Sequence, residues 1–300
     1  MMSALTARIS RQKQPKPTWR PPGASTIGQK LAAGFLLLVV FVAIFAQQIA
    51  PHDPNGQSLA RRLQPPIWEG GTLEFILGTD ELGRDVLTRI MYGAQTSISI
   101  GIVVVLITMV VGTTLGIIAG YVRGRFDTVL MWICDVVLSL PGLLLSAVLV
   151  FVLGASATTV IIALSIEGWL VYCRMARGMV LTVRSTAYID ATRTIGTPPI
   201  RVLVRHVLPN IAPPIVTLAT LEFARVVLAE AALSFLGFGI QPPLVSWGLM
   251  INSGGDYLTI AWWLITLPGL VLTITVLSAN VVSDWLRQLT DPLAQAVSAR

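Results

Sequence analysis

The chain contains six long stretches in which nearly every residue is apolar. Each approaches the roughly 20 residues that an α-helix needs to cross a hydrocarbon core about 30 Å thick. The fourth stretch is the shortest and carries Glu167 and Gly168. The pattern predicts an all-α, polytopic integral membrane protein with six transmembrane helices. The six stretches are residues 31–50, 97–121, 129–153, 157–171, 211–236 and 261–282.

The polar segments between these stretches divide the chain into four parts. Residues 1–30 form a hydrophilic N-terminal tail, and residues 31–96 hold the first transmembrane helix and an external segment. Residues 97–283 form the transmembrane core, and residues 284–300 form a C-terminal tail. A cleaved signal peptide is an alternative for the first stretch, but the long polar lead favours a retained helix.

Both external segments have distinctive sequences. The string LGTDELGRD, which ends at Asp85, alternates turn formers with charges and predicts a turn that caps the second transmembrane helix. Its alternative role is a contact surface for an external partner. The second segment, residues 237–260, is apolar and is expected to lie at the interface or to re-enter the membrane, with Trp247, Trp262 and Trp263 at headgroup depth.

Composition and charge agree with a membrane protein and give its orientation. With 54% hydrophobic and 12% charged residues and a mean hydropathy of +0.75, the chain has too little polar surface for a soluble enzyme. Sixteen Lys and Arg residues fall on the N-terminal side of the spans, whereas four fall on the other side beside six acidic residues. Both termini are therefore predicted to be cytoplasmic. The net charge of +6 reflects this orientation and leaves no basic patch for nucleic acid.

The basic segment after the fourth stretch has the signals of two short helices joined by a corner. Ser185 or Thr186 can cap the first helix, which Gly196 would end. The second helix would begin at Pro199 and end at Pro209. Small or apolar residues recur at four-residue spacing in the first helix, so the pair is expected to present a face that it cannot bury alone. The alternative is a surface helix pair against lipid headgroups.

Ionisable residues inside the apolar stretches cost a few kcal/mol each and usually face protein or water. Glu222 and Arg225 are three residues apart and can form an ion pair on one helix. Glu230 lies about two turns further along nearly the same face, so this helix could line a polar translocation path. Asp135, near the cytoplasmic end of its stretch, is expected to have solvent or a basic neighbour. The full set is Asp135, Glu167, Glu222, Arg225 and Glu230.

The sequence contains no enzymatic constellation. His52 and His206, the two histidines, fall on opposite sides of the membrane in this topology, so no His-based catalytic or metal site is expected. No phosphate loop ending in Gly-Lys-Ser/Thr is present, and no cofactor is expected. Cys134 and Cys173 are expected to be reduced packing residues. If ATP drives transport here, another subunit must hydrolyse it.

The string YIDATRTIGTPPIRVLVRHVLPN, residues 188–210, resembles the coupling motif of bacterial binding-protein-dependent ABC importer permeases. Its DAT triplet takes the place of the motif's Glu-Ala-Ala, and a glycine follows at the motif's spacing. The acid is Asp instead of Glu, and Thr replaces the second Ala, which leaves the turn intact. In a motif at about 185–210, the resemblance assigns ATPase coupling to Tyr188, Asp190, Ala191, Thr192, Gly196, His206, Leu208 and Pro209.

Three further stretches narrow the resemblance. LGTDELGRDVLTRIMYGAQTSISIG, LSFLGFGIQPPLVSWGLMI and DWLRQLTDP are similar to parts of the C-type permease of the dipeptide, oligopeptide and nickel importers. The likeness extends from Leu31 to Pro292. It implies a non-catalytic subunit in a bacterial inner membrane. Glycines spaced by four at 112, 116 and 120 would allow the close helix approach that rigid-body transmission needs.

The resemblance also implies partners. The chain would form a heterodimer with a paralogous permease, bind two cytoplasmic ABC ATPases through the coupling motif, and receive a peptide or similar small solute from an external, periplasmic solute-binding protein. The solute would be released near residues 237–257 and the first external segment. Nickel and glutathione remain open as cargo.

Two other functional classes fit parts of the sequence. An ATPase-independent secondary transporter or channel would use Glu222, Arg225 and Glu230 as an ion relay, although no inverted repeat is visible. A membrane scaffold would use the helix pair to recruit a cytoplasmic partner, but it leaves the buried charges unexplained.

Overall fold

The protein is a bundle of long helices in a computed structural model that describes residues 26–186 and 197–290. The described residues form helices, turns and one isolated bridge between Thr79 and Asp85, which confirms the all-α class. The main helices are α2 (Ile27–Ile49), α3 (Val86–Val122), α4 (Gly124–Leu138), α5 (Gly142–Leu153), α6 (Ala157–Arg184), α8 (Pro199–Val202), α9 (Leu208–Phe235), α10 (Trp247–Gly254) and α11 (Trp263–Thr290). Short turns are η2 (Leu59–Arg61), η3 (Ile67–Glu69), η5 (Gly255–Tyr257) and the π-helical η4 (Leu203–Val207).

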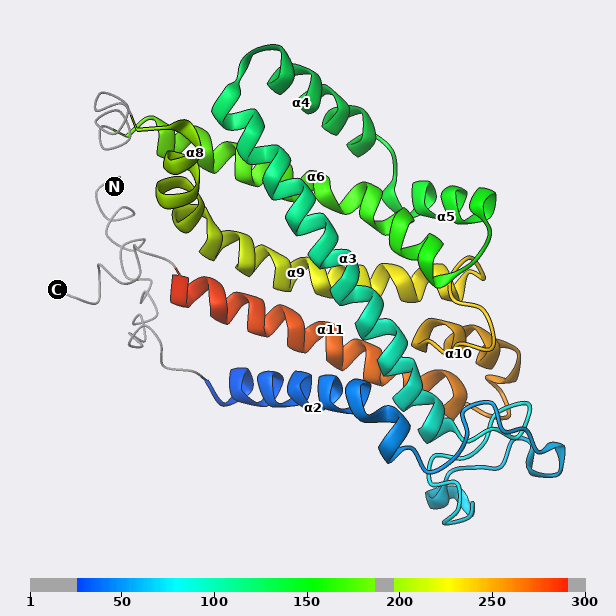
Figure 1. Ribbon diagram of the computed structural model, residues 1–300. Helices are drawn as coiled ribbons and strands as arrows, with labels where there is room; N and C mark the ends of the chain where they lie inside the picture. Colours follow the sequence, from blue (N-terminus) through cyan, green and yellow to red (C-terminus); the bar gives the residue numbers. More distant parts are fainter. Residues whose placement is uncertain (1–25, 187–196, 291–300) are drawn as a thin grey trace, which may run out of the picture.

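Five helices are long and apolar enough to cross a membrane, and the bent pair α4–α5 makes a sixth when it is counted as one span. The third predicted span, 129–153, is not one helix: α4 and α5 are bent by 87°. Pro141 caps α5 and disfavours a helical conformation in the residue before it, which explains the break. In Figure 1, α3 ends at one end of the bundle and α6 begins at the other, so α4 and α5 together carry the chain across.

Several spans are longer than their apolar stretches. α3 begins at residue 86 instead of 97, α6 continues to residue 184 instead of 171, and α11 continues to residue 290 instead of 282. α3 starts at the Asp85 side-chain cap, and α6 ends at its C-cap Ser185, whose N–H bonds back to the last turn, so caps, not hydropathy alone, set these two bounds. At the start of the first described helix, Thr26 and Gln29 form a capping box for α2.

Pro209 does not end the second short helix, contrary to the prediction. α8 begins at Pro199 as expected, but Ile200–Phe235 is one continuous run of 36 residues. Within it, the Leu208 N–H donates to the carbonyl oxygen of Leu203, five residues back. This π-turn widens the helix just before Pro209, which has no N–H to give, so the proline is tolerated at the start of α9.

The tightest packing joins α3 to α6 along the predicted glycine ladder. A Cβ added at Gly112 would lie less than 3.0 Å from the carbonyl oxygen of Trp169. At Gly116 it would lie equally close to the carbonyl oxygen of Cys173. Without side chains at these positions the two backbones meet directly, which confirms the predicted close approach and makes α3 and α6 one rigid unit.

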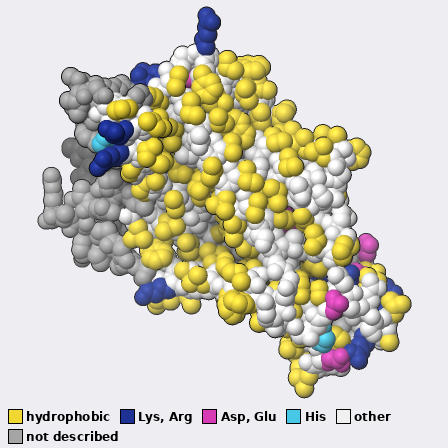
Figure 2. Space-filling model, viewed as in Figure 1, with side chains coloured by type: hydrophobic (Ala, Val, Ile, Leu, Met, Phe, Trp, Pro, Cys, Tyr) yellow, Lys and Arg dark blue, Asp and Glu magenta, His cyan; other side chains and the backbone are white. Residues whose placement is uncertain are grey.

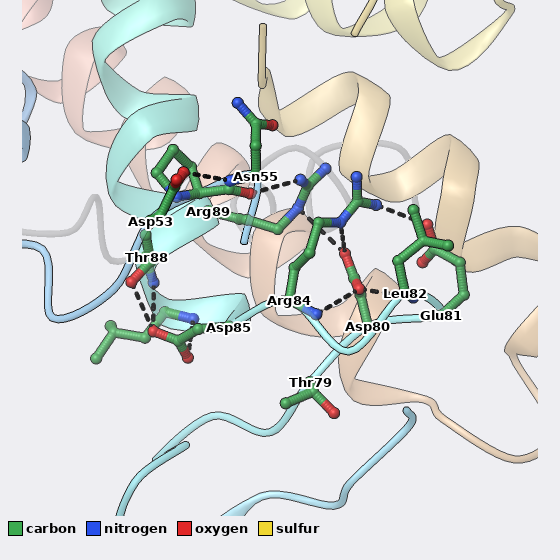
Figure 3. Close-up of polar contacts among 12 residues, drawn as sticks. Asp53, Asn55, Thr79, Asp80, Glu81, Leu82, Arg84, Asp85, Thr88 and Arg89 are labelled. Atoms are coloured by element: carbon green, nitrogen blue, oxygen red, sulfur yellow. Dashed lines mark hydrogen bonds and ion pairs between the residues drawn. The ribbon is translucent and has the colours of Figure 1, made fainter. Parts of the chain in front are cut away.

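The external segment between α2 and α3 is a small folded element held by ion pairs (Figure 3). Asp85 caps α3 as predicted, and its Oδ2 accepts from the Thr88 hydroxyl at 2.6 Å. Asp80 Oδ2 accepts a hydrogen bond from Arg84 Nε at 2.7 Å and forms an ion pair with Arg89 Nε at 3.3 Å. Because Arg89 belongs to α3, this cluster fixes the external segment on the end of the bundle.

Glu81 completes this cluster. Arg84 Nη2 donates to Glu81 Oε1 at 2.8 Å. Burial is the main cause that raises the pKa of Glu81, and the neighbouring Asp80 carboxylate raises it further. The group therefore takes up a proton more readily in the folded protein, and its contribution to stability falls as pH rises through the raised pKa.

The second external segment folds back into the bundle. Trp247 is fully buried inside the bundle, and its indole N–H donates to the Ile90 carbonyl oxygen at 3.0 Å. Trp263 is also buried, whereas Trp262 is 37% exposed and donates to Glu69 Oε1. α10 packs between α9 and α11, so this loop belongs to the core.

Candidate functional site

One end of the bundle carries basic side chains and the start of the α8–α9 helix. α2 begins and α11 ends at this same end (Figure 1). Figure 2 shows basic side chains and a histidine gathered over α8 and η4, next to hydrophobic side chains. Arg201 and Arg205 are exposed there, and His206 is half-buried on the π-turn. The opposite end carries the acid-rich external segment (Figure 2).

The predicted coupling residues fall partly within the described structure. His206, Leu208 and Pro209 lie where η4 passes into α9, and Leu208 is 40% exposed. The amide of Asn210 donates to the carbonyl oxygen of His206 at 2.6 Å, which satisfies an acceptor at the widened turn. The other predicted coupling residues, Tyr188, Asp190, Ala191, Thr192 and Gly196, lie outside the described residues.

Two further acidic residues tie α4 to α6 near this basic end. Arg177 Nη2 donates to Asp127 Oδ2 at 2.7 Å, and Arg174 donates to Asp135 Oδ1. The basic neighbour predicted for Asp135 is thus Arg174. Both pairs hold the first arm of the bent α4–α5 crossing against α6.

An arginine with two carboxylates lies inside the bundle. Arg225 Nε donates to Glu222 Oε2 at 2.7 Å, which confirms the predicted pair on α9. Arg225 Nη1 also donates to Glu167 Oε1 on α6 at 3.2 Å, a partner that the sequence analysis had not assigned. The Glu222 side chain is 8% exposed and that of Arg225 is 38% exposed. The cluster therefore has one accessible, cationic side and a buried acidic side.

Glu167 also contacts the bend in the third crossing. A Cβ added at Gly142, the first residue of α5, would overlap the Glu167 carboxylate. A carboxylate at a helix N-terminus is stabilised by the helix dipole and by free N–H groups. Glu167 thus lies between the start of α5 and Arg225, and it links the bent crossing to α9.

Glu230 occupies a separate and fully enclosed site. Its exposed fraction is 0%, and its two carboxylate oxygens accept from the hydroxyls of Ser97 at 2.8 Å and Ser234 at 2.7 Å. Ser97 belongs to α3, so Glu230 joins α9 to α3. A solute could contact Glu230 only after one of these serines moved.

No cluster of three or more His, Cys, Asp or Glu side chains able to hold a metal ion occurs among residues 26–186 and 197–290. The cysteines Cys134 and Cys173 are free and fully buried between α4 and α6. The chemistry that the described residues offer is ion pairing and hydrogen bonding across helices, together with an exposed basic end.

A family model described as the binding-protein-dependent transport system inner membrane component matches residues 112–295, more than half of the chain. The chain belongs to this family. A second model, the N-terminal TM domain of oligopeptide transport permease C, matches residues 30–66. The chain is therefore the non-catalytic, multi-pass permease subunit of an ABC importer in the inner membrane, where such permeases work with ATPases and a binding protein.

Relatives of the permease span nearly its whole length. The di/tripeptide transport system permease protein DppC of Pseudomonas aeruginosa is 42% identical over 86% of each chain. The probable D,D-dipeptide transport system permease protein DdpC of Escherichia coli K12 is 35% identical over 98% of each chain. The glutathione transport system permease protein GsiD of Pectobacterium atrosepticum is 35% identical over 96% of this chain and 95% of its own.

Solved structures show the same fold. The inward-facing MetNI methionine ABC transporter matches with a TM-score of 0.57 and 19% identity, over 68% of the permease and 98% of the solved chain. Membership of this family favours an ABC importer permease over the two alternative functional classes, an ATPase-independent transporter and a membrane scaffold.

Proposed function

We propose that the permease pairs with a paralogous permease and forms with it the path for a dipeptide or similar small peptide, which a periplasmic solute-binding protein delivers. The names of the relatives, with di/tripeptide, D,D-dipeptide and glutathione as cargo, support a small peptide. The observation that carries the proposal is the unbroken helix from residue 200 to residue 235, which joins the motif at about 185–210 to the buried ion cluster.

This helix is suited to transmit force. From Ile200 to Arg225 there are 25 residue steps, which at 1.5 Å each give about 38 Å of helix. The helix is continuous from residue 200 to residue 235 although Pro213 and Pro214 inside it donate no N–H, so a displacement at the coupling motif would be carried along it to the ion cluster. ATP-driven approach of two ATPases docked at the motif would thereby open the path to one side or the other.

In this proposal the accessible side of the ion cluster contributes to the path. Arg225 is bonded to two carboxylates and is partly exposed, so it can offer its remaining N–H donors to a peptide carboxylate. Glu222 and Glu167 hold it in place and balance its charge. Glu230 remains a predicted path residue that acts only in a conformation in which its serine partners have separated.

We also propose that the basic end faces the cytoplasm, with residues 1–30 and the C-terminal tail on that side. Lys and Arg are enriched in cytoplasmic loops. Arg201, Arg205 and the arginines at 123 and 125 all lie at this end, whereas the external segment is acidic.

Thiol labelling tests this orientation. Arg125→Cys at the basic end and Leu73→Cys in the external segment introduce exposed thiols, whereas the native Cys134 and Cys173 are 0% exposed and give little background. In intact cells, a membrane-impermeant maleimide is expected to label L73C only. Labelling of R125C but not of L73C in intact cells would show the opposite orientation and contradict the proposal.

Coupling is tested in the complex that co-purifies with the permease, reconstituted into vesicles with its binding protein. Asp190→Lys and Gly196→Phe are expected to lower ATP-dependent dipeptide uptake about tenfold or more while ATP hydrolysis and membrane insertion persist. Asp190→Glu restores the family's acid and serves as the matched control, with uptake close to wild type. Normal uptake by either D190K or G196F would count against the coupling role.

A further inference from the structure

An apolar groove of about 520 Å³ runs between α3 and the α8–α9 helix. Its size falls in the range of about 300–1,000 Å³ that is typical of small-molecule sites. Apart from Thr113 and Thr114, every residue that lines it is apolar. Residues from both walls include Met109, Val110, Ile117, Val204, Ile211 and Val216.

The groove has the length of one membrane leaflet. Its α3 wall extends from Met109 to Ile118, nine residue steps or about 14 Å of helix. Ile118 lies four residues before the end of α3 at the basic end. Half of a hydrocarbon core is about 15 Å. The groove thus begins near the basic surface and stops close to the middle of the membrane.

Two arginines lie at the mouth of the groove. A neighbouring hollow is lined by Arg201, Arg205 and Pro209, and it shares Ile200 and Val204 with the groove. Arg201 and Arg205 are exposed, and neither takes part in an ion pair among the described residues. Figure 2 shows basic side chains directly beside hydrophobic ones at this end. A cationic mouth on an apolar groove complements a molecule with an anionic head and a hydrocarbon tail.

We propose that the groove holds an acyl chain of an anionic phospholipid from the cytoplasmic leaflet, with the phosphate bound by Arg201 and Arg205. Guanidinium groups match phosphate oxygens in bidentate geometry, and basic pockets between transmembrane helices on the cytoplasmic side bind anionic headgroups. The inference rests on the proposed orientation of the basic end. The lipid would lie against the π-turn that joins the coupling motif to α9, where it supports the helix that transmits the ATPase movement.

Native mass spectrometry of the whole complex tests the site, with equal amounts of phosphatidylglycerol and phosphatidylethanolamine supplied in the detergent. The wild-type complex is expected to retain phosphatidylglycerol preferentially. The double variant Arg201→Gln/Arg205→Gln is expected to lower that retention about thirtyfold, since each basic residue near an anionic surface contributes a factor of about five. Ala212→Trp, which fills the groove, is expected to lower retention without changing the charge.

Arg123→Gln/Arg125→Gln is the matched control, because it removes two exposed arginines at the same end that do not line the groove. An equal loss in this control, or no loss in R201Q/R205Q or in A212W, would overturn the site. Photocrosslinking from a benzophenone side chain placed at residue 110 to the partner permease would also overturn it, since a protein helix would then occupy the groove. Lipid retention is measured without peptide or ATP. A failure of the transport proposal would therefore appear in peptide uptake and leave the lipid measurement unchanged.

Discussion

Replacing Gly116 by Leu is expected to prevent the permease from accumulating as a stable complex. The new Cβ would lie less than 3.0 Å from the carbonyl oxygen of Cys173 and 2.9 Å from the Ala176 Cβ. A carbonyl oxygen inside a helix cannot move away as a flexible side chain can, so α3 and α6 must separate. Overpacking of this kind costs about 3 kcal/mol. Thermal unfolding of the detergent-solubilised complex, together with its yield, measures the effect.

Gly178→Leu is the matched control for this substitution. Gly178 lies on α6 itself, yet a Cβ added there has no atom within 4 Å. The same change of residue should therefore leave the melting temperature close to that of the wild type. If G116L unfolded at the same temperature as G178L, the close contact of α3 and α6 would not hold the bundle together.

The sequence was informative where the signal is local. Asp85 was identified as a cap because the first N–H groups of any helix need acceptors, and the glycines of α3 because their spacing matches one helix face. The pair between Glu222 and Arg225 followed from a separation of three residues on one helix. Each of these features depends on neighbours in the chain, so each could be predicted without the fold.

Other features depend on packing between distant segments and could not be predicted. Glu167 and Arg225 are 58 residues apart, and only the contact of α6 with α9 brings them together. The break between α4 and α5 lies inside a run so uniformly apolar that hydropathy cannot locate it, although Pro141 was a visible signal. Pro209 in the sequence predicts a helix end, because the π-turn that accommodates this proline has no sequence signature of its own.

Replacing Arg225 by Leu is expected to destabilise the complex and to abolish peptide uptake. The change leaves the Glu222 carboxylate, whose side chain is 8% exposed, without its cation. Losing one partner of a buried pair costs about 3–5 kcal/mol, and we expect about 2–3 kcal/mol here because 38% of the Arg225 side chain is exposed. Thermal unfolding and dipeptide uptake are measured on the same reconstituted preparations.

Three further variants separate the structural role of Arg225 from its proposed role in the path. The double variant Glu222→Gln/Arg225→Leu removes the buried Glu222 carboxylate and leaves only Glu167, whose side chain is 22% exposed, without its cation, so most of the lost stability should return. If Arg225 binds the peptide carboxylate, uptake stays absent in that double variant, whereas Arg225→Lys, which keeps the cation, retains part of it. Recovery of uptake together with stability in the double variant would show that Arg225 serves only to neutralise Glu222. The single variant Glu222→Gln completes a double-mutant cycle with Arg225→Leu and the double variant. The cycle gives the interaction energy between Glu222 and Arg225.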